Sequence, residues 1–324
     1  MKNILLKSLM ILLVTVVMIL LLAYSVVGVI MLGPSKEASR LLVTTLMETS
    51  AAKFVPRLYM SEKKIESIIS RSEEAIDLEV DSALIDLPSD DSEINNGIEI
   101  IDIKGGTYNG KMMVIADPTR VFVGVPEHGF GEDKSGMTVH EMINHYGAVG
   151  GTNAGGFYDP NGNGTGGIPA GIVIYDGKML WGLKDSYYSI AGIDKDGLLH
   201  VGKMTGASAI EKEIMYAASY GPALIVNGKP QNEYADLGGG LNPRTAIGQR
   251  ADGAILLLVI NGRSVDSLGA TYDDLVEVFL EYGAVNATNL DGGSSSLMIY
   301  NGKNITSSAY VYGERVVATS ILVK

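Results

Sequence analysis

The sequence predicts an α+β fold, in which a large mixed β-sheet domain with a few packed helices follows a transmembrane helix and a helical, acidic stalk. Three patterns along the 324 residues support this prediction. The chain opens with a long apolar run, continues through a strongly acidic stretch, and changes near residue 97 to short β-rich runs separated by turn signals. These patterns divide the chain into residues 1–34, 35–96 and 97–324.

The first part, residues 1–34, is predicted to be an N-terminal signal anchor. Residues 8–33 carry no charge, and at about 1.5 Å per residue a helix of this length spans a hydrocarbon core of about 30 Å. The run is longer than that of a cleavable signal peptide, and Ala23-Tyr24-Ser25 is a poor cleavage site. We therefore expect contact with the membrane through residues 8–32.

The charges that flank this run predict the orientation of the anchor. Lys2 and Lys7 precede the run, whereas Lys36 and Arg40 follow it with Glu37 between them. The positive-inside rule then slightly favours an N-terminus in the cytoplasm. The prediction is a single-pass protein of the cell membrane whose C-terminal domain is extracytoplasmic, which is compatible with the absence of cysteine.

The second part, residues 35–96, is predicted to be a partly helical stalk, from Leu41 to about Ile76, followed by a solvated linker. Residues 61–99 contain 12 acidic residues against 3 basic ones, which accounts for most of the net charge of −12. Acidic segments of this composition stay solvated because they cannot bury enough apolar surface. Since the chain has no basic patch, nucleic acid is excluded as a partner.

The third part, residues 97–324, is predicted to be built mainly from strands. Asn-Gly and Asp-Gly pairs, typical of β-hairpin turns, recur between apolar runs. We expect strands at 171–175, 223–226, 254–260 and 296–300. Helices are expected at 138–146, 209–217 and 271–282. This order of strands and helices differs from the regular alternation of strand and helix in a doubly wound α/β fold.

One unit of this third part occurs twice. Residues 146–156 read YGAVGGTNAGG and residues 282–293 read YGAVNATNLDGG. Each copy follows an amphipathic helix that begins with a capping box, at Thr138 in the first copy and, more weakly, at Thr271 in the second. Each helix has an apolar stripe that we expect to be buried, formed by Val139, Met142, Ile143 and Tyr146 in the first and by Leu275, Val276, Phe279 and Leu280 in the second.

Each copy ends in a polar residue carried on a glycine-rich loop after a short apolar strand. The first copy delivers Asn153 and the second delivers Asp291. Glycine allows a backbone to approach a ligand closely, and ligands commonly bind beyond the ends of strands. Two similar structural units with tight turns are the alternative, but the different polar residues favour a ligand site.

Five motifs follow one another along residues 97–324. They are GTNAGGFY at 151–158, YGPAL at 220–224, NPRTAIG at 242–248, NLDGGSSS at 289–296 and GERVVA at 313–318. In this order they resemble the phosphodiester glycosidase family, which includes the enzyme that uncovers mannose 6-phosphate by removing N-acetylglucosamine from a phosphodiester. Bacterial relatives are described as exopolysaccharide-related. The chain departs from the family pattern at Ala154, Val316 and Thr319.

The resemblance implies that the substrate is a sugar joined to phosphate, and this chemistry asks for particular residues. The leaving phosphate monoester has a second pKa of about 6, so it needs less protonation than a sugar alkoxide. A rigid cation that donates two hydrogen bonds suits the leaving phosphate, and Arg244 is the candidate for this role. Alternatively, Arg244 forms an ion pair on the surface. The other predicted substrate-binding residues are Asn153, Gly155, Gly156, Asn242, Thr245, Gly292, Gly293, Ser294 and Ser295, although the serines also suit an ordinary turn.

Cleavage at an anomeric carbon calls for a carboxylate as nucleophile or base. Asp291 is the first candidate, because it lies between an apolar strand and two glycines. Asp159 is the second, because it directly follows Phe157 and Tyr158 after the first loop. If both act, the distance between the two carboxyl groups decides between retention and inversion.

No metal and no cofactor are predicted. Residues 159–164 match the first half of a calcium loop, but Ala170 stands where the loop needs glutamate, so a polar turn is favoured. Calcium is compatible with this segment without being predicted. His140 and His145 are five residues apart, about 140° around a helix, whereas a zinc motif needs them four apart. We exclude zinc and expect both histidines to be exposed.

The sequence therefore predicts a membrane-anchored, extracytoplasmic hydrolase that cleaves a glycosyl phosphodiester in cell-envelope or exopolysaccharide material. The alternative is a non-catalytic module that binds an envelope glycan or sugar phosphate through the same loops. A transferase that moves a sugar phosphate is a third possibility. If the loops form one site, Asn153, Asp159, Arg244 and Asp291 should converge in the fold.

Overall fold

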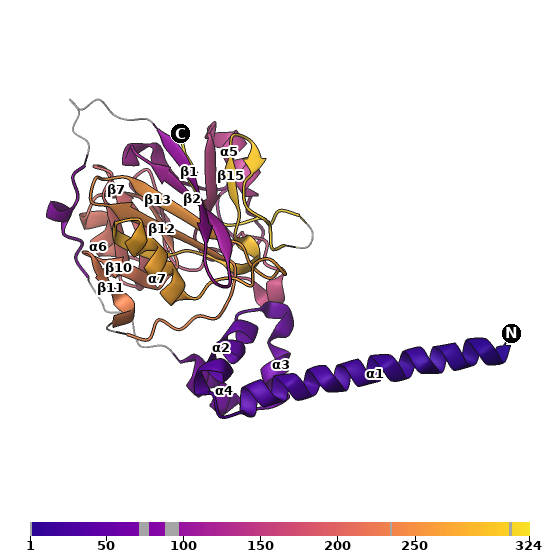
Figure 1. The fold of residues 1–324 in the computed structure, drawn as a ribbon. Helices are drawn as coiled ribbons and strands as arrows, with labels where there is room; N and C mark the ends of the chain where they lie inside the picture. The colour runs from indigo at the N-terminus through magenta and orange to yellow at the C-terminus, as the bar shows by residue number, and fades with distance from the viewer. Residues whose placement is uncertain (1, 71–77, 88–96, 234, 311–312) are drawn as a thin grey trace. The chain divides into compact units, whose positions relative to one another are not determined.

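The computed structural model of the chain describes residues 2–70, 78–87, 97–233, 235–310 and 313–324. The chain divides into two compact units, Met1–Ser70 and Arg71–Lys324 (Figure 1). Residues 78–86 belong to the larger unit: the amide of Asp81 donates to Asn227 Oδ1 (2.8 Å) and the amide of Asp86 to the carbonyl of Ala251 (2.7 Å). The expected domains 1–34, 35–96 and 97–324 stay predictions.

The smaller unit is helical. It contains α1 (Lys2–Leu32), α2 (Lys36–Met47), α3 (Phe54–Arg57) and α4 (Glu62–Ile69). Met31, Val43 and Ile65 form its buried cluster. The helical stalk begins at Lys36, earlier than predicted, because the side chain of Ser35 caps α2. The predicted end of the stalk, near Ile76, lies outside the described residues.

Helix α1 has the length and composition of a membrane span. Residues Ile4–Leu32 have a mean hydropathy of 2.9 in their most apolar window. A signal sequence near an N-terminus has the same properties. The helix is therefore a signal sequence or a transmembrane span.

The described residues of the larger unit form three sheets. The first has the order β1-β2-β13-β12-β14-β10-β11, the second β16-β15-β4-β17-β3 and the third β6-β5-β9-β7-β8. Its strands are β1 (Ile98–Lys104), β2 (Asn109–Ile115), β3 (Val121–Gly124), β4 (Gly150–Asn153), β5 (Val173–Tyr175), β6 (Lys178–Trp181), β7 (Tyr187–Asp194), β8 (Leu199–Thr205), β9 (Ile214–Ser219), β10 (Ala223–Val226), β11 (Lys229–Pro230), β12 (Arg244–Arg250), β13 (Ile255–Ile260), β14 (Ala284–Asn289), β15 (Met298–Tyr300), β16 (Lys303–Asn304) and β17 (Ser320–Val323).

The α+β class predicted from the sequence is confirmed, with one difference in the sheet. The strand pairs between the described strands are antiparallel and belong to three sheets, where one large mixed sheet was expected. Tight turns join many consecutive strands, and a tight turn can produce only an antiparallel pair. The predicted strands at 171–175, 223–226, 254–260 and 296–300 correspond to β5, β10, β13 and β15.

The cores lie on both faces of the seven-stranded sheet. In β13, Ile255, Leu257 and Val259 point into the core shared by the three sheets, whereas Leu256, Leu258 and Ile260 point toward α7 (Tyr272–Glu281). This alternation explains the uninterrupted apolar run of β13, since successive side chains of a strand point to opposite faces. Figure 1 shows α7 against this sheet.

Helix α5 (Val139–Tyr146) and α7 match the two helices that precede the repeated loops. The helix expected at 209–217 is wrong in extent: α6 covers Gly206–Glu211, and residues 214–219 form β9. Glu213 takes a positive φ of 53°, which stops the helix, and β9 pairs with both β5 and β7. Partners on both sides of β9 override the local helical pattern.

The apolar stripes of α5 and α7 are buried except at their ends. Val139, Met142, Ile143, Leu275, Val276 and Phe279 are buried, Tyr146 is half-buried, and Leu280 is 42% exposed. Leu280 was wrongly placed in the stripe, because it lies about 140° around the helix from Leu275, at the edge of the apolar face.

The two histidines of α5 differ in exposure. His145 is exposed, as predicted. His140 is only part-exposed, contrary to prediction, because Glu314 covers it: Nδ1 lies 2.8 Å from one carboxylate oxygen, and the backbone amide of His140 donates to the other (2.9 Å).

Candidate active site

The two repeated units bring their loops together although their strands belong to different sheets. Both helices begin with a complete capping box, and both units turn at a glycine of positive φ, Gly147 and Gly283. The side-chain amide of Asn153 donates to the carbonyl of Asp291 (2.6 Å), and the amide of Asp291 donates to the carbonyl of Ala154 (2.8 Å). The predicted convergence of the two loops is confirmed.

Asn153 acts as a brace at this junction. It is fully buried, and its Oδ1 accepts hydrogen bonds from Thr245 Oγ1 (2.9 Å), Thr152 Oγ1 (3.2 Å) and the amide of Leu297 (3.3 Å). A buried side chain with these partners is well suited to fix backbone and poorly suited to meet a ligand. The predicted contacts of Asn153 and Thr245 with substrate therefore stay predictions, while their described contacts are those of a scaffold.

Asp159 lies in the same site through its contact with Arg315, a residue that was not predicted from the sequence. The guanidinium of Arg315 forms an ion pair with Asp159, donates to Ser294 Oγ (3.0 Å) and lies over the ring of Phe157, 4.8 Å from its centroid. The Arg315 side chain is 8% exposed and that of Asp159 is 25% exposed. A buried arginine held in this way is pre-organised to bind an anion.

The carboxyl group of Asp291 is electrostatically unusual. Burial raises its pKa to about 6, and the negative charge of Asp159 contributes to the rise. The Ser295 hydroxyl, the charge of Arg315 and the Gly292 amide act in the opposite direction. Perturbed carboxyl groups of this kind are frequent in catalytic sites, because the charged form is poorly solvated.

Arg244 lies beside the second loop, but its guanidinium has other partners. It donates to the backbone carbonyls of Ala270 (3.0 Å from Nε) and Gly240, and it lies 4.3 Å above the centroid of the Tyr272 ring. Gly292 adjoins both the backbone and the side chain of Arg244: a Cβ on Gly292 would lie 3.8 Å from Arg244 Cα and 3.9 Å from its Cδ. These contacts hold the start of β12 against α7, and the role of Arg244 as a phosphate ligand stays a prediction.

The backbone amides of the glycine pairs are largely engaged within the protein. Gly155 donates to Thr319 Oγ1 (2.9 Å), Gly156 to the carbonyl of Ser219 (3.1 Å) and Gly293 to the carbonyl of Pro243 (2.8 Å). These amides were expected to face a ligand. Glycine is required here for packing instead: a Cβ on Gly156 would lie 2.9 Å from the Tyr220 ring.

Three further residues around the loops were not selected from the sequence. Tyr158 is 63% exposed and Tyr220 is 36% exposed, so both present aromatic surface near Gly156. Exposed Arg263 lies against Gly293 and donates to the Asn242 side chain (3.1 Å). Arg315, Tyr158 and Tyr220 lie within the quoted motifs, which was a usable signal, whereas Arg263 lies outside them.

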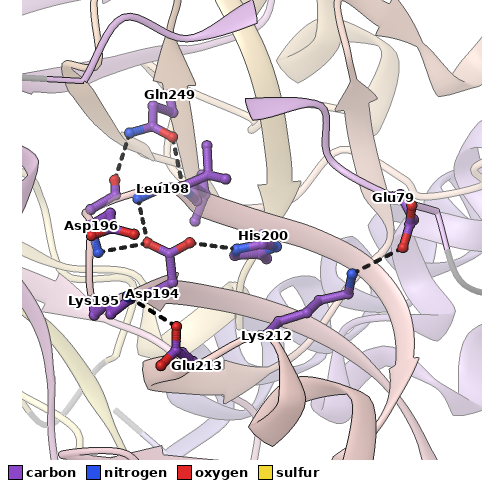
Figure 2. Close-up of polar contacts among 11 residues, drawn as sticks. Glu79, Asp194, Lys195, Asp196, Leu198, His200, Lys212, Glu213 and Gln249 are labelled. Atoms are coloured by element: carbon purple, nitrogen blue, oxygen red, sulfur yellow. Dashed lines mark hydrogen bonds and ion pairs between the residues drawn. The ribbon is translucent and has the colours of Figure 1, made fainter. Parts of the chain in front are cut away.

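A second polar cluster, at the β7–β8 hairpin, is structural (Figure 2). Asp194 accepts from His200 (2.9 Å) and from the amides of Asp196 and Leu198 (both 3.0 Å). Burial alone would raise the pKa of Asp194, but these hydrogen bonds hold it below its ordinary value. Buried Gln249 bonds the same turn, donating to the carbonyl of Gly197 (2.8 Å). The cluster closes a hairpin.

The segment that resembles half of a calcium loop forms a turn. Pro160–Gly162 is a single 3₁₀ turn, and the amide of Gly164 donates to Asp159 Oδ1 (2.6 Å). Among the described residues, no group of three or more histidine, aspartate or glutamate side chains is arranged to hold a metal ion.

Comparisons with known proteins show what this chain is similar to. The sequence model of the phosphodiester glycosidase family matches residues 146–324, which contain both repeated loops. A prophage-derived protein of Bacillus subtilis (strain 168), YomE, is 38% identical over 101 residues. The matched segment is 30% of this chain but only 16% of that relative.

Two solved structures have a similar fold. The catalytic domain of zebrafish N-acetylglucosamine-1-phosphodiester alpha-N-acetylglucosaminidase is 21% identical, with a TM-score of 0.58 over 74% of this chain and 86% of that one. A protein of Burkholderia pseudomallei K96243 is 17% identical, with a TM-score of 0.51 over 67% of this chain and 74% of that one. At these identities the similarity is one of fold.

Proposed function

This chain belongs to the phosphodiester glycosidase family, and from that premise we propose that it hydrolyses a glycosyl phosphodiester in cell-envelope or exopolysaccharide material. One observation carries the proposal. Asp291, whose pKa is raised to about 6, shares a cluster with Asp159 and the buried guanidinium of Arg315. A carboxylate beside a fixed cation suits the cleavage of a bond between a sugar and a phosphate.

In the proposed reaction, the bond between the anomeric carbon and the phosphate oxygen breaks, and the phosphate monoester leaves with the bonding electrons. Water supplies hydroxyl to the sugar. Ionised Asp291 serves as the nucleophile that forms a glycosyl intermediate, or as the base that takes a proton from the attacking water. The leaving group is already an anion, so the reaction needs little help from a general acid.

Arg315 has the role of stabilising negative charge in this proposal. Its ion pair with Asp159, its bond to Ser294 and its contact with the Phe157 ring fix its orientation before substrate arrives. A pre-oriented donor stabilises a transition state without reorganisation. Asp159 then positions Arg315 and supports its charge.

The sugar is proposed to bind against Tyr220 and Tyr158. Both rings are exposed, and Tyr220 packs directly on Gly156, two residues from the carbonyl that accepts from Asp291. Aromatic rings next to a polar centre are common in sites for ligands with apolar faces.

We further propose that α1 remains in the chain as a membrane anchor and that the larger unit works outside the cytoplasm. The support is the length and apolar composition of α1 together with the charge bias around it. An extracellular polymer or envelope phosphodiester is accessible only from that side.

Turnover by the full-length protein tests the enzymatic proposal. Detergent-purified protein is incubated with a panel of sugar-1-phosphodiesters, and free sugar and phosphate monoester are measured. Arg315→Lys should lower turnover strongly, whereas Arg250→Lys, at the far end of β12 and paired with Asp252, should not. Binding without product would favour the glycan-binding module, and product formed only with an added alcohol acceptor would favour a transferase.

A further inference from the structure

The helical unit covers only the last turns of α1. Every side chain from residue 4 to residue 26 is exposed, and Val27 is the first that is half-buried. Further along, Met31 is buried in a cluster with Val43 of α2 and Ile65 of α4. Figure 1 shows α1 extending past the other helices of this unit. The end of α1 is therefore part of a folded helical unit, whereas the turns before it are exposed on all sides within this unit.

Two tyrosines mark the boundary between the exposed and the covered parts of α1. The Tyr59 ring stacks on the Tyr24 ring, with centroids 4.8 Å apart, and the Tyr59 hydroxyl donates to the Tyr24 carbonyl (2.7 Å). A Cβ on Gly28 would lie 3.1 Å from the Tyr59 ring, so glycine allows this close approach. Tyr24 is 52% exposed. Exposed tyrosines of this kind are typical of the interface between hydrocarbon and water.

The helices that cover residues 27–32 are too polar to lie in hydrocarbon. The buried hydroxyl of Ser39 in α2 donates to the carbonyl of Met31 (2.7 Å), and α4 contributes to the same cluster. Together α2 and α4 carry the charged residues Lys36, Glu37, Arg40, Glu62, Lys63, Lys64 and Glu66. Charged side chains are excluded from the centre of a bilayer unless they are paired in the interior of a bundle. Since residues 27–32 of α1 pack against these helices, this part of α1 also lies outside the hydrocarbon.

The exposed part of α1 is long enough to cross a bilayer without residues 24–32. Residues 4–23 extend over about 30 Å at about 1.5 Å per residue, which matches the thickness of a hydrocarbon core. Lys7 lies near the start of this part, where a long side chain can reach the interface. The full apolar run, Ile4–Leu32, would measure about 43 Å and would have to tilt strongly to fit.

Given the proposed membrane anchor, we propose that residues 4–23 form the span within the hydrocarbon and that residues 24–70 form a juxtamembrane unit on the lipid surface. The Tyr24–Tyr59 pair contacts the lipid headgroups. The packing of Met31 against α2 and of Gly28 against Tyr59 stops α1 from entering the bilayer further. This span begins and ends nearer the N-terminus than residues 8–32, the span expected from the sequence.

A depth measurement along α1 tests the position of the span, and the absence of cysteine from the chain makes it direct. The full-length protein is labelled with a nitroxide at one introduced cysteine and reconstituted into vesicles of phosphatidylcholine and phosphatidylglycerol. The labelled variants change exposed side chains: Leu9→Cys, Leu13→Cys, Val17→Cys, Leu20→Cys and Val29→Cys. The ratio of collisions with oxygen to collisions with a water-soluble nickel complex reports the depth of each label.

We expect the deepest label at Leu13, next to the middle of residues 4–23. The label at Val29 should be open to the nickel complex, as should the control label at Glu66→Cys, an exposed position of α4. For a span of residues 8–32, Leu20 would be the deepest position, whereas here it lies about 10 Å from the middle of the bilayer. A deepest label at Val17 or Leu20 would overturn the proposed span.

Fractionation of cells and the intact mass of the mature protein separate this proposal from the anchor on which it depends. If α1 is removed as a signal sequence, the mature protein lacks residues 4–23 and leaves the membrane without detergent. The anchor and the proposed span then both fail, and the hydrolase proposal is unaffected. An intact protein that stays in the membrane, with its deepest label at Leu20, keeps the anchor and overturns the proposed span alone.

Discussion

The side-chain amide of Asn153 donates a 2.6 Å hydrogen bond to the carbonyl of Asp291, which lies 138 residues further along the chain. This bond joins the two copies of the repeated unit at the point where the second copy presents its carboxylate. Asn153 therefore fixes the backbone that carries Asp291, and the repeat produces one site from two sheets.

The first prediction concerns this brace. Asn153→Ala removes a buried amide and leaves Thr245 Oγ1 and the Asp291 carbonyl without their partner. We expect the free energy of unfolding to fall by roughly 2–4 kcal/mol. Urea denaturation measures this, with Asn304→Ala at an exposed position as the control. A loss below about 1 kcal/mol, the typical effect of a surface change, would show that Asn153 does not brace the site.

The second prediction concerns the pH dependence of the rate. The pKa of Asp291 is raised to about 6, and the proposed nucleophile or base must be ionised. kcat/KM for a sugar-1-phosphodiester should therefore rise with pH and level off above about pH 6, since the diester is anionic throughout this range. A rate that falls as pH rises through 6 would assign Asp291 as an acid and contradict the proposed role.

The third prediction concerns stability, and its sign follows from the same shift. Because the folded pKa of Asp291 lies above the unfolded value, the folded state binds the extra proton, and its stability declines as pH rises from about 4 to about 6. At pH 7 the buried charge costs up to about 3 kcal/mol. Asp291→Asn should thus stabilise the protein at pH 7 and have little effect on its stability near pH 4. Equal effects at both pH values would mean that the carboxyl is not desolvated.

Local patterns in the sequence predicted much of this framework. The capping boxes at Thr138 and Thr271 and the glycines that follow the helices depend on neighbouring residues, so the two units could be identified directly. The convergence of Asn153 with Asp291 followed from the repeat itself. The residues of β9 were predicted to be partly helical, because pairing with β5 and β7 depends on residues distant in the sequence and is not visible in the local pattern.

The side-chain partners of the site were harder to predict. Arg244 and Arg315 lie in equally conspicuous motifs, and only the fold shows that Arg244 meets Tyr272 while Arg315 meets Asp159. Arg263 lies against Gly293 although the two residues are 30 positions apart in the sequence. No sequence motif contains Arg263, so its position could not be predicted. Long-range packing decides which arginine faces the carboxylates.

The fourth prediction concerns topology. If α1 spans the membrane with its N-terminus inside, protease added to intact spheroplasts should digest the larger unit. Lysed spheroplasts are the control for protease access, and a cytoplasmic protein checks that the intact cells are sealed. Protection of residues 97–324 until lysis would contradict the extracytoplasmic assignment.

The hydrolysis of a sugar-1-phosphodiester by wild type and by Asp291→Asn tests the central claim most directly. Free sugar and phosphate monoester are quantified together after incubation with each full-length protein, and circular dichroism confirms that the variant is folded. The account predicts equimolar release of both products by wild type and at least about a 10³-fold lower rate for Asp291→Asn, as expected when an essential nucleophile or base is lost. Equal rates for the two folded proteins would contradict it.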